Sequence, residues 1–144
     1  MERITDLERN YVKEVLDSSF RSSSGAIMMK RFEEAFRNKF SANHAISFVN
    51  GTATMHAALE AIDIMPGDEV IVPPLTMSST AFAVLQANAT PVFADVNPDT
   101  FQIDPCSIEA NITSKTKAII SVALYGGAPD LARIRSICDS HELF

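Results

Sequence analysis

The chain has 144 residues, a formal net charge of −6 at pH 7 and a pI of about 4.9. This length is enough for one domain with a hydrophobic core. The acidic balance, with no cluster of Lys and Arg, argues against a nucleic-acid partner. No apolar run approaches the ~20 residues that span a bilayer, and the charged first residues lack the apolar segment of a secretory signal. We therefore expect a cytoplasmic protein without membrane contact, whose Cys106 and Cys138 are reduced.

Residues 1–44 are expected to form two helices and a connector. Thr5 and Glu8 have the spacing of a capping box, which predicts a helix that runs to about Ser18. A serine-rich connector at 18–25 leads to a second expected helix at 28–40. One face of that helix carries aromatic residues at intervals of four, which predicts core packing rather than a ligand site: Phe32, Phe36 and Phe40.

From residue 45 onward, short apolar runs alternate with helical patterns. This alternation predicts an α/β fold, with a parallel or mixed sheet that carries helices on both faces. The expected strands are 45–49, 69–72, 91–94 and 118–124, and Leu143-Phe144 is the expected start of another. The expected helices are 52–63, 78–88, a short helix after Asp104-Pro105, and 130–141. We therefore divide the chain into 1–44 and a sheet-containing part at 45–144.

The segment Asn50-Gly51-Thr52-Ala53 joins the first expected strand to the next helix. Gly51 permits a tight turn and the close approach of a ligand, and Thr52 is a good helix N-cap. The first amides of the helix, including those of Thr52 and Ala53, would point outward, as they do at sites that hold phosphate. The residues alone leave two interpretations open, a phosphate site and a plain strand-to-helix turn.

Several segments occur in an order and at a spacing typical of one family. They are PGDEVIVP at 66–73, LTMSST at 75–80, ATPVFADV at 89–96, NPDTFQIDP at 97–105, TKAII at 116–120 and LYG at 124–126. With the turn at Gly51, they closely resemble the N-terminal part of the sugar-nucleotide aminotransferases of the DegT/DnrJ/StrS type. The resemblance runs from about Ser23 to the last residue. It implies fold type I, with residues 45–144 as a truncated large domain that binds pyridoxal phosphate.

The resemblance also implies the cofactor site. It assigns the phosphate cradle to Gly51, Thr52 and Ala53, and it places at Met77 the side chain that packs on the cofactor ring. Many relatives have an aromatic residue at this position, and a polarizable thioether can also lie against a ring. Tyr125, at the rim after the last complete strand, is expected to help line the site. The chain departs from the family pattern after Gly126, because Gly127 stands where relatives often have a polar residue that contacts the site.

In the family the Schiff-base lysine and the aspartate that faces the pyridine nitrogen lie further along the chain than residue 144. The five lysines present do not match that lysine: Lys13, Lys30, Lys39, Lys115 and Lys117. We therefore expect an N-terminal segment with no catalytic residue of its own, inactive alone and without a metal site.

The implied activity of the parent protein is transfer of an amino group, commonly from glutamate, to a keto-sugar nucleotide. The family's dimeric active sites also imply a homodimer. Two alternatives remain open from the sequence. One is a pyridoxal-phosphate-dependent sugar dehydratase of the same family, and the other is a non-catalytic fragment that keeps only the phosphate-binding turn.

Overall fold

The computed structural model of the chain describes residues 3–18 and 26–144. The fold divides into two compact units, with the boundary between Phe48 and Val49. The connector predicted at 18–25 therefore lies outside the described residues except for Ser18. Across the described ranges, no helix combines the length and apolar character needed to cross a membrane.

The first unit contains the two expected helices, α1 (Asp6–Asp17) and α2 (Ile27–Phe40). The predicted capping box is present. The Thr5 hydroxyl accepts a hydrogen bond from the Leu7 amide, and the Glu8 carboxylate accepts one from the Thr5 amide at 2.7 Å. An ion pair between Arg31 Nη1 and Glu14 Oε2, at 2.9 Å, joins the two helices.

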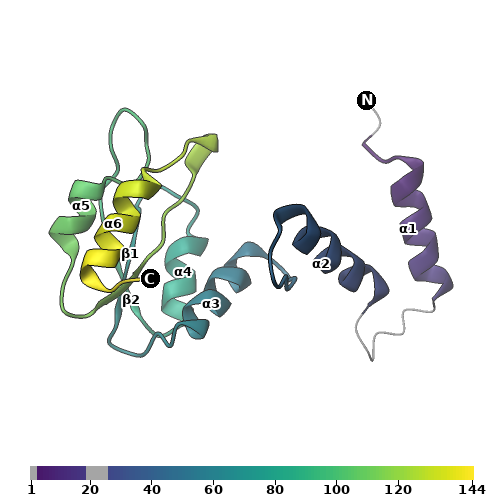
Figure 1. Cartoon of the computed structure of the whole chain (residues 1–144), viewed down its shortest axis with the longest axis horizontal. Helices are drawn as coiled ribbons and strands as arrows, with labels where there is room; N and C mark the ends of the chain where they lie inside the picture. Colours follow the sequence, from purple (N-terminus) through teal and green to yellow (C-terminus); the bar gives the residue numbers. More distant parts are fainter. Residues whose placement is uncertain (1–2, 19–25) are drawn as a thin grey trace. The chain divides into compact units, whose positions relative to one another are not determined.

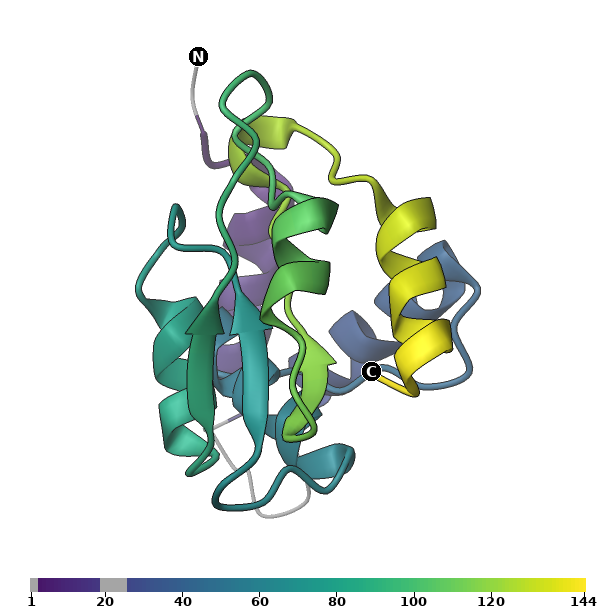
Figure 2. The same ribbon diagram turned by 90° about the vertical axis from the view of Figure 1, so that its left-hand side faces the viewer.

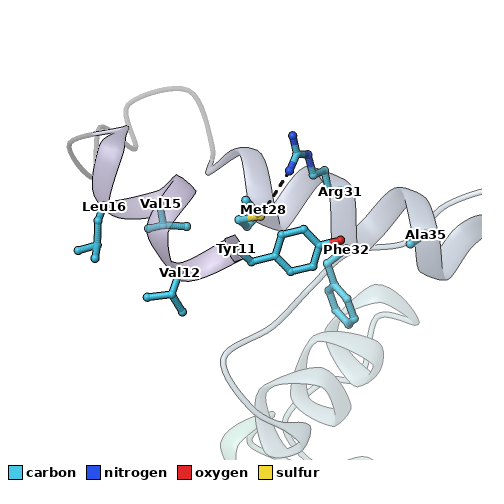
Figure 3. A pocket seen from close by; sticks show the side chains of 8 residues that line it. All are labelled: Tyr11, Val12, Val15, Leu16, Met28, Arg31, Phe32 and Ala35. Carbon is cyan, nitrogen blue, oxygen red and sulfur yellow. Dashed lines mark hydrogen bonds between the residues drawn. The ribbon is translucent and has the colours of Figure 1, made fainter. Parts of the chain in front are cut away.

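The phenylalanine stripe of α2 is not part of a core, contrary to the prediction. Phe32, Phe36 and Phe40 are 58, 46 and 64% exposed. Their rings pack on one another instead, with the centroids of Phe36 and Phe40 4.5 Å apart. The helical spacing correctly put these rings on one face, but no described element of the first unit covers that face. An apolar pocket of about 630 Å³ lies beside it, between α1 and α2 (Figure 3).

The second unit is built on a three-stranded parallel sheet in the order β2-β1-β3. The strands are β1 (Glu69–Val72), β2 (Thr90–Phe93) and β3 (Thr116–Ile119). The helices of the unit are α3 (Gly51–Ala61), α4 (Ser79–Gln86), α5 (Pro105–Asn111), α6 (Leu131–His141) and a 3₁₀ turn, η1 (Leu124–Gly126). Figure 2 shows the three strands side by side with their arrowheads at the same edge.

The central strand β1 is buried on both faces. Val70 and Val72 belong to one core cluster, with side chains of α3 and α4, and Ile71 belongs to a second, with side chains of α5 and α6. This alternation follows from the two-residue period of a strand. It confirms the predicted α/β fold with helices on both faces of the sheet. Figure 1 labels these helices, α3 and α4 on one side and α5 and α6 on the other.

The predicted strand at 45–49 is wrong, because these residues form no ladder with a described strand. The reason is visible at Ser47, whose amide and hydroxyl both donate to Glu33 Oε1 of α2, at 2.9 and 2.8 Å. These bonds replace strand pairing, and they hold the pKa of Glu33 below its ordinary value.

At the other side of the sheet, β3 ends at Ile119, so it is shorter than the predicted strand at 118–124. The expectation of a further strand at Leu143-Phe144 agrees with the backbone. The Phe144 amide donates to the Lys117 carbonyl at 3.0 Å, and the Phe144 carbonyl accepts from the Ile119 amide at 2.9 Å. This pair of bonds is the pattern of a parallel ladder.

We expect Ile71→Ala to lower the free energy of unfolding by about 2–5 kcal/mol, because it leaves a cavity in a fully buried position. Urea unfolding followed by circular dichroism measures this. The matched control is Ile46→Ala, since Ile46 is 73% exposed and its truncation should change stability by no more than about 0.5 kcal/mol. Equal effects of the two substitutions would contradict the assigned core.

Candidate functional site

Helix α3 begins one residue earlier than predicted, and its cap is Asn50 rather than Thr52. Asn50 has extended backbone angles (φ −164°, ψ 172°), and its Oδ1 accepts a hydrogen bond from the Ala53 amide at 2.9 Å. Asparagine is as good an N-cap as threonine or better, so the pair Asn50-Gly51 could have indicated this start. The Ala53 amide is therefore engaged within the turn.

The amides of Gly51 and Thr52 remain open. Neither has a hydrogen-bond partner among the described residues, and the same holds for the Thr52 hydroxyl. The next hydroxyl along the helix differs, because Thr54 Oγ1 donates to the Asn50 carbonyl at 3.2 Å. Two free N–H groups at the positive end of a helix dipole form a site suited to an anion.

Gly51 is exposed, and a Cβ placed on it would meet no atom within 4 Å. Its φ does not lie in the left-handed region, so the folded chain itself does not require glycine here. Because glycine has no side chain, the space in front of the first amides of the helix is clear. The first turn of α3 also carries no acidic residue that would repel an anion.

Met77 lies in the loop between β1 and α4, two residues before the first residue of α4. Its side chain is 75% exposed, so it fills no gap in the core. Its carbonyl accepts from the Thr80 amide at 3.1 Å, which anchors the backbone at the start of α4. Helices α3 and α4 pack against each other, but no hydrogen bond between described residues joins Met77 to the turn at Gly51.

The carboxyl ends of the three parallel strands meet at one edge of the sheet, which is where ligands bind in sheets of this kind. The loop with Met77 leaves this edge after β1, and the chain that follows β3 carries Tyr125, which is 88% exposed. The lysines of this unit, Lys115 and Lys117, stand at the opposite end of the sheet, at the start of β3. The remaining lysines belong to the first unit.

Comparison with known proteins identifies the relatives of this chain. The model of the DegT/DnrJ/EryC1/StrS aminotransferase family matches residues 2–144. GDP-perosamine synthase of Caulobacter vibrioides is 44% identical over 98% of this chain and 38% of its own length. The corresponding enzyme of Vibrio cholerae is 37% identical over 95% of this chain and 37% of its own length.

Comparison with solved structures supports the same family. An aminotransferase from Psychrobacter cryohalolentis superposes with a TM-score of 0.90, at 38% identity, over 98% of this chain and 36% of that one. NtdA of Bacillus subtilis with bound cofactor PMP gives a TM-score of 0.87, at 37% identity, over 93% of this chain and 30% of that one.

The chain thus spans somewhat more than a third of the length of the curated relatives cited. The family and its cofactor-bound structures indicate pyridoxal phosphate as the cofactor. The predicted fold type I is likewise that of the matched structures. Because the family model covers nearly every residue, the chain belongs to the DegT/DnrJ/EryC1/StrS aminotransferase family.

Proposed function

We propose that this chain supplies the phosphate-binding end of a pyridoxal phosphate site, in an enzyme that transfers an amino group to a keto-sugar nucleotide. The single observation that carries the proposal is the open start of α3. Two amides and the Thr52 hydroxyl are without partners in the described chain, and the glycine at their head leaves them accessible.

The residues present fit the phosphate of this cofactor. In the proposed site the amides of Gly51 and Thr52 and the Thr52 hydroxyl donate to phosphate oxygens. The free amides and the dipole of a helix start favour such an anion. Ala53 contributes less directly than the sequence suggested. Its amide donates to Asn50 Oδ1, so its part is to fix the turn and to leave space.

In this proposal the exposed thioether of Met77 packs on the ring of the cofactor. When bound, pyridoxal phosphate supplies an electron sink that stabilises negative charge on the substrate carbon. The chain's own residues bind and orient the phosphate end, and 45–144 act as part of the large domain.

We propose that the covalent lysine and the carboxylate beside the pyridine nitrogen come from outside residues 1–144, and that these 144 residues are inactive alone. The relatives are more than twice as long as the match, which leaves room for both groups. Lys115 and Lys117 stand at the end of the sheet opposite its carboxyl edge, which supports their exclusion.

The keto-sugar nucleotide is proposed from the relatives, two of which are named as GDP-perosamine synthases. Glutamate is the proposed amino donor, since the resemblance of the sequence implies it. A cytoplasmic location is proposed as well, in keeping with the two unbonded cysteines, Cys106 and Cys138.

We also propose that the protein is a homodimer. Besides the family resemblance, the apolar surface of the first unit supports this. The pocket between α1 and α2 is lined almost wholly by apolar side chains, among them Val12, Leu16 and Phe32, and each of these three is more than half exposed. A cluster of exposed apolar side chains such as this one marks an interaction site.

The phosphate site is tested by Thr52→Ala. We expect the substitution to weaken binding of pyridoxal phosphate and of inorganic phosphate by roughly 10- to 100-fold, because a hydrogen bond to a charged group contributes about 1.5–3 kcal/mol. Titration followed by ³¹P NMR measures the affinity, and urea unfolding checks the fold. The matched control is Thr54→Ala, whose hydroxyl is directed at the Asn50 carbonyl. Equal loss in both variants would contradict the assigned cradle.

The absence of the covalent anchor is tested by borohydride reduction in the presence of pyridoxal phosphate. We expect no stoichiometric adduct on any one of the five lysines, because all five are exposed and a lysine that forms a Schiff base is usually activated in a desolvated pocket. Mass spectrometry of the digested protein locates any adduct. A single lysine that is modified completely would show that the anchor lies within the chain.

The dimer is tested by Leu16→Glu, which places a charge in the pocket between α1 and α2. We expect wild-type protein to sediment as a dimer or larger species and Leu16→Glu to shift toward monomer, because burying the new carboxylate is costly. Leu131→Glu on α6 is the matched control, since Leu131 is 58% exposed and Leu16 is 57% exposed. A wild-type protein that stays monomeric over a wide concentration range would refute the proposal.

A further inference from the structure

The turn that follows β3 has an unusual backbone for its sequence. Tyr125 and Gly126 are both in the left-handed region, with φ of 54° and 82°. Glycine adopts this conformation freely, but tyrosine does so only under strain. Tyr125 is 88% exposed and belongs to neither core cluster. The packing of the core therefore gives no reason for this strained conformation.

A buried side chain from a distant segment holds this turn. Gln102 is 5% exposed, and its Nε2 donates to the Leu124 carbonyl at 3.1 Å and to the Thr100 carbonyl at 3.2 Å. The turn at 97–102 and η1 thus lie side by side beyond the arrowheads of the strands, as Figure 2 shows.

The orientation of the Gln102 carboxamide is determined by these two carbonyls, because only the NH₂ group can donate to them. The cost is that Oε1 is buried without a hydrogen-bond partner in the described part of the chain. The segment that carries Gln102 is itself fixed. Asn97 Oδ1 accepts from the amides of Asp99 and Thr100, at 2.9 and 3.1 Å, and Val96 pairs with Ile103.

Gly127 completes the arrangement. A Cβ at this position would lie 2.6 Å from Gln102 Nε2 and 3.2 Å from the Leu124 carbonyl oxygen. Its φ of −70° would suit any residue, so the absent side chain serves only to leave room for the carboxamide. Any larger residue at 127 would push Gln102 away from Leu124.

We propose that Gln102 is a positioning residue, which locks the turn at 124–127 so that the exposed ring of Tyr125 contacts the substrate at the carboxyl edge of the sheet. The inference rests on the proposed function for the class of substrate, a nucleotide sugar. An aromatic ring held rigidly in solvent offers a flat surface for stacking on a sugar or base, and its hydroxyl can form a hydrogen bond. Backbone strain of this kind gathers at functional sites.

The composition of the chain allows a direct test, because Tyr11 and Tyr125 are its only tyrosines. In a Tyr11→Phe background, incorporation of 3-fluorotyrosine gives a single ¹⁹F resonance from residue 125. We expect a resonance distinct from that of the urea-unfolded chain, and a shift of this resonance on titration with GDP-mannose.

Gln102→Leu introduces an apolar side chain of similar size and removes both hydrogen bonds that Nε2 donates, and Gly127→Ala displaces the carboxamide. We expect each to move the ¹⁹F resonance toward the unfolded position and to weaken GDP-mannose binding at least fivefold. The affinity for pyridoxal phosphate should stay within twofold.

A double variant tests whether the two residues act together. Adding Gly127→Ala to Gln102→Ala should change the resonance less than Gly127→Ala does alone, because the Gln102 carboxamide atoms that clash with the new Cβ are gone. Ile46→Ala, at a residue that is 73% exposed and has no assigned role in the site, is the control for the resonance.

An unchanged ¹⁹F resonance in Gln102→Leu, in a protein with wild-type circular dichroism, would overturn the positioning role. A wild-type resonance that does not respond to GDP-mannose would overturn the contact of Tyr125 with the substrate. Both readouts are independent of the phosphate cradle, so a failure of pyridoxal phosphate to bind would count against the proposed function and not against the lock on Tyr125.

Discussion

The double-sided burial of β1 is the constraint on which the second unit depends. Val70, Ile71 and Val72 are completely buried, and they alternate between the cluster under α3 and α4 and the cluster under α5 and α6. A strand in this position must be central, and its parallel partners must return through helical crossovers. The carboxyl ends of the strands are therefore brought to one edge, where Met77 and the turn with Tyr125 are found.

The anion site that we propose at the start of α3 has a different origin, which is the incomplete capping of a helix. Every helix begins with amides that lack partners within the helix. Here the Asn50 side chain engages only the Ala53 amide, and the amides before it stay open. The cap and the proposed ligand site are thus complementary. Asn50 fixes the helix start, and the groups it leaves free are those that we propose to bind phosphate.

The first unit presents the opposite situation, with apolar side chains that no described element of the unit covers. The rings of Phe32, Phe36 and Phe40 pack on one another along α2, and the pocket between α1 and α2 is open to solvent. Packing of side chains along one helix stabilises it only slightly. Besides this packing, the unit has the Thr5 capping box at the start of α1 and a solvent-exposed ion pair, Arg31–Glu14, between α1 and α2.

The sequence by itself determined what depends on neighbouring residues. The capping box at Thr5, the cap of α5 at Asp104, the strand at 69–72 and the alternation of strands with helices all follow from short-range patterns, and the linked motifs identify the family. Local chemistry also indicated an anion site at Gly51 and Thr52, although it assigned the cap to the wrong residue, since both Asn50 and Thr52 suit that role.

Only the tertiary structure decided what depends on distant partners. An apolar run at 45–49 forms a strand only if another strand pairs with it, and Ser47 bonds to Glu33 instead. A helix face becomes core only if another element covers it, which the stripe of α2 lacks within its unit. The contact between Gln102 and Leu124 joins residues 22 positions apart. It could not be predicted from the sequence, because no local rule brings a buried carboxamide to that carbonyl.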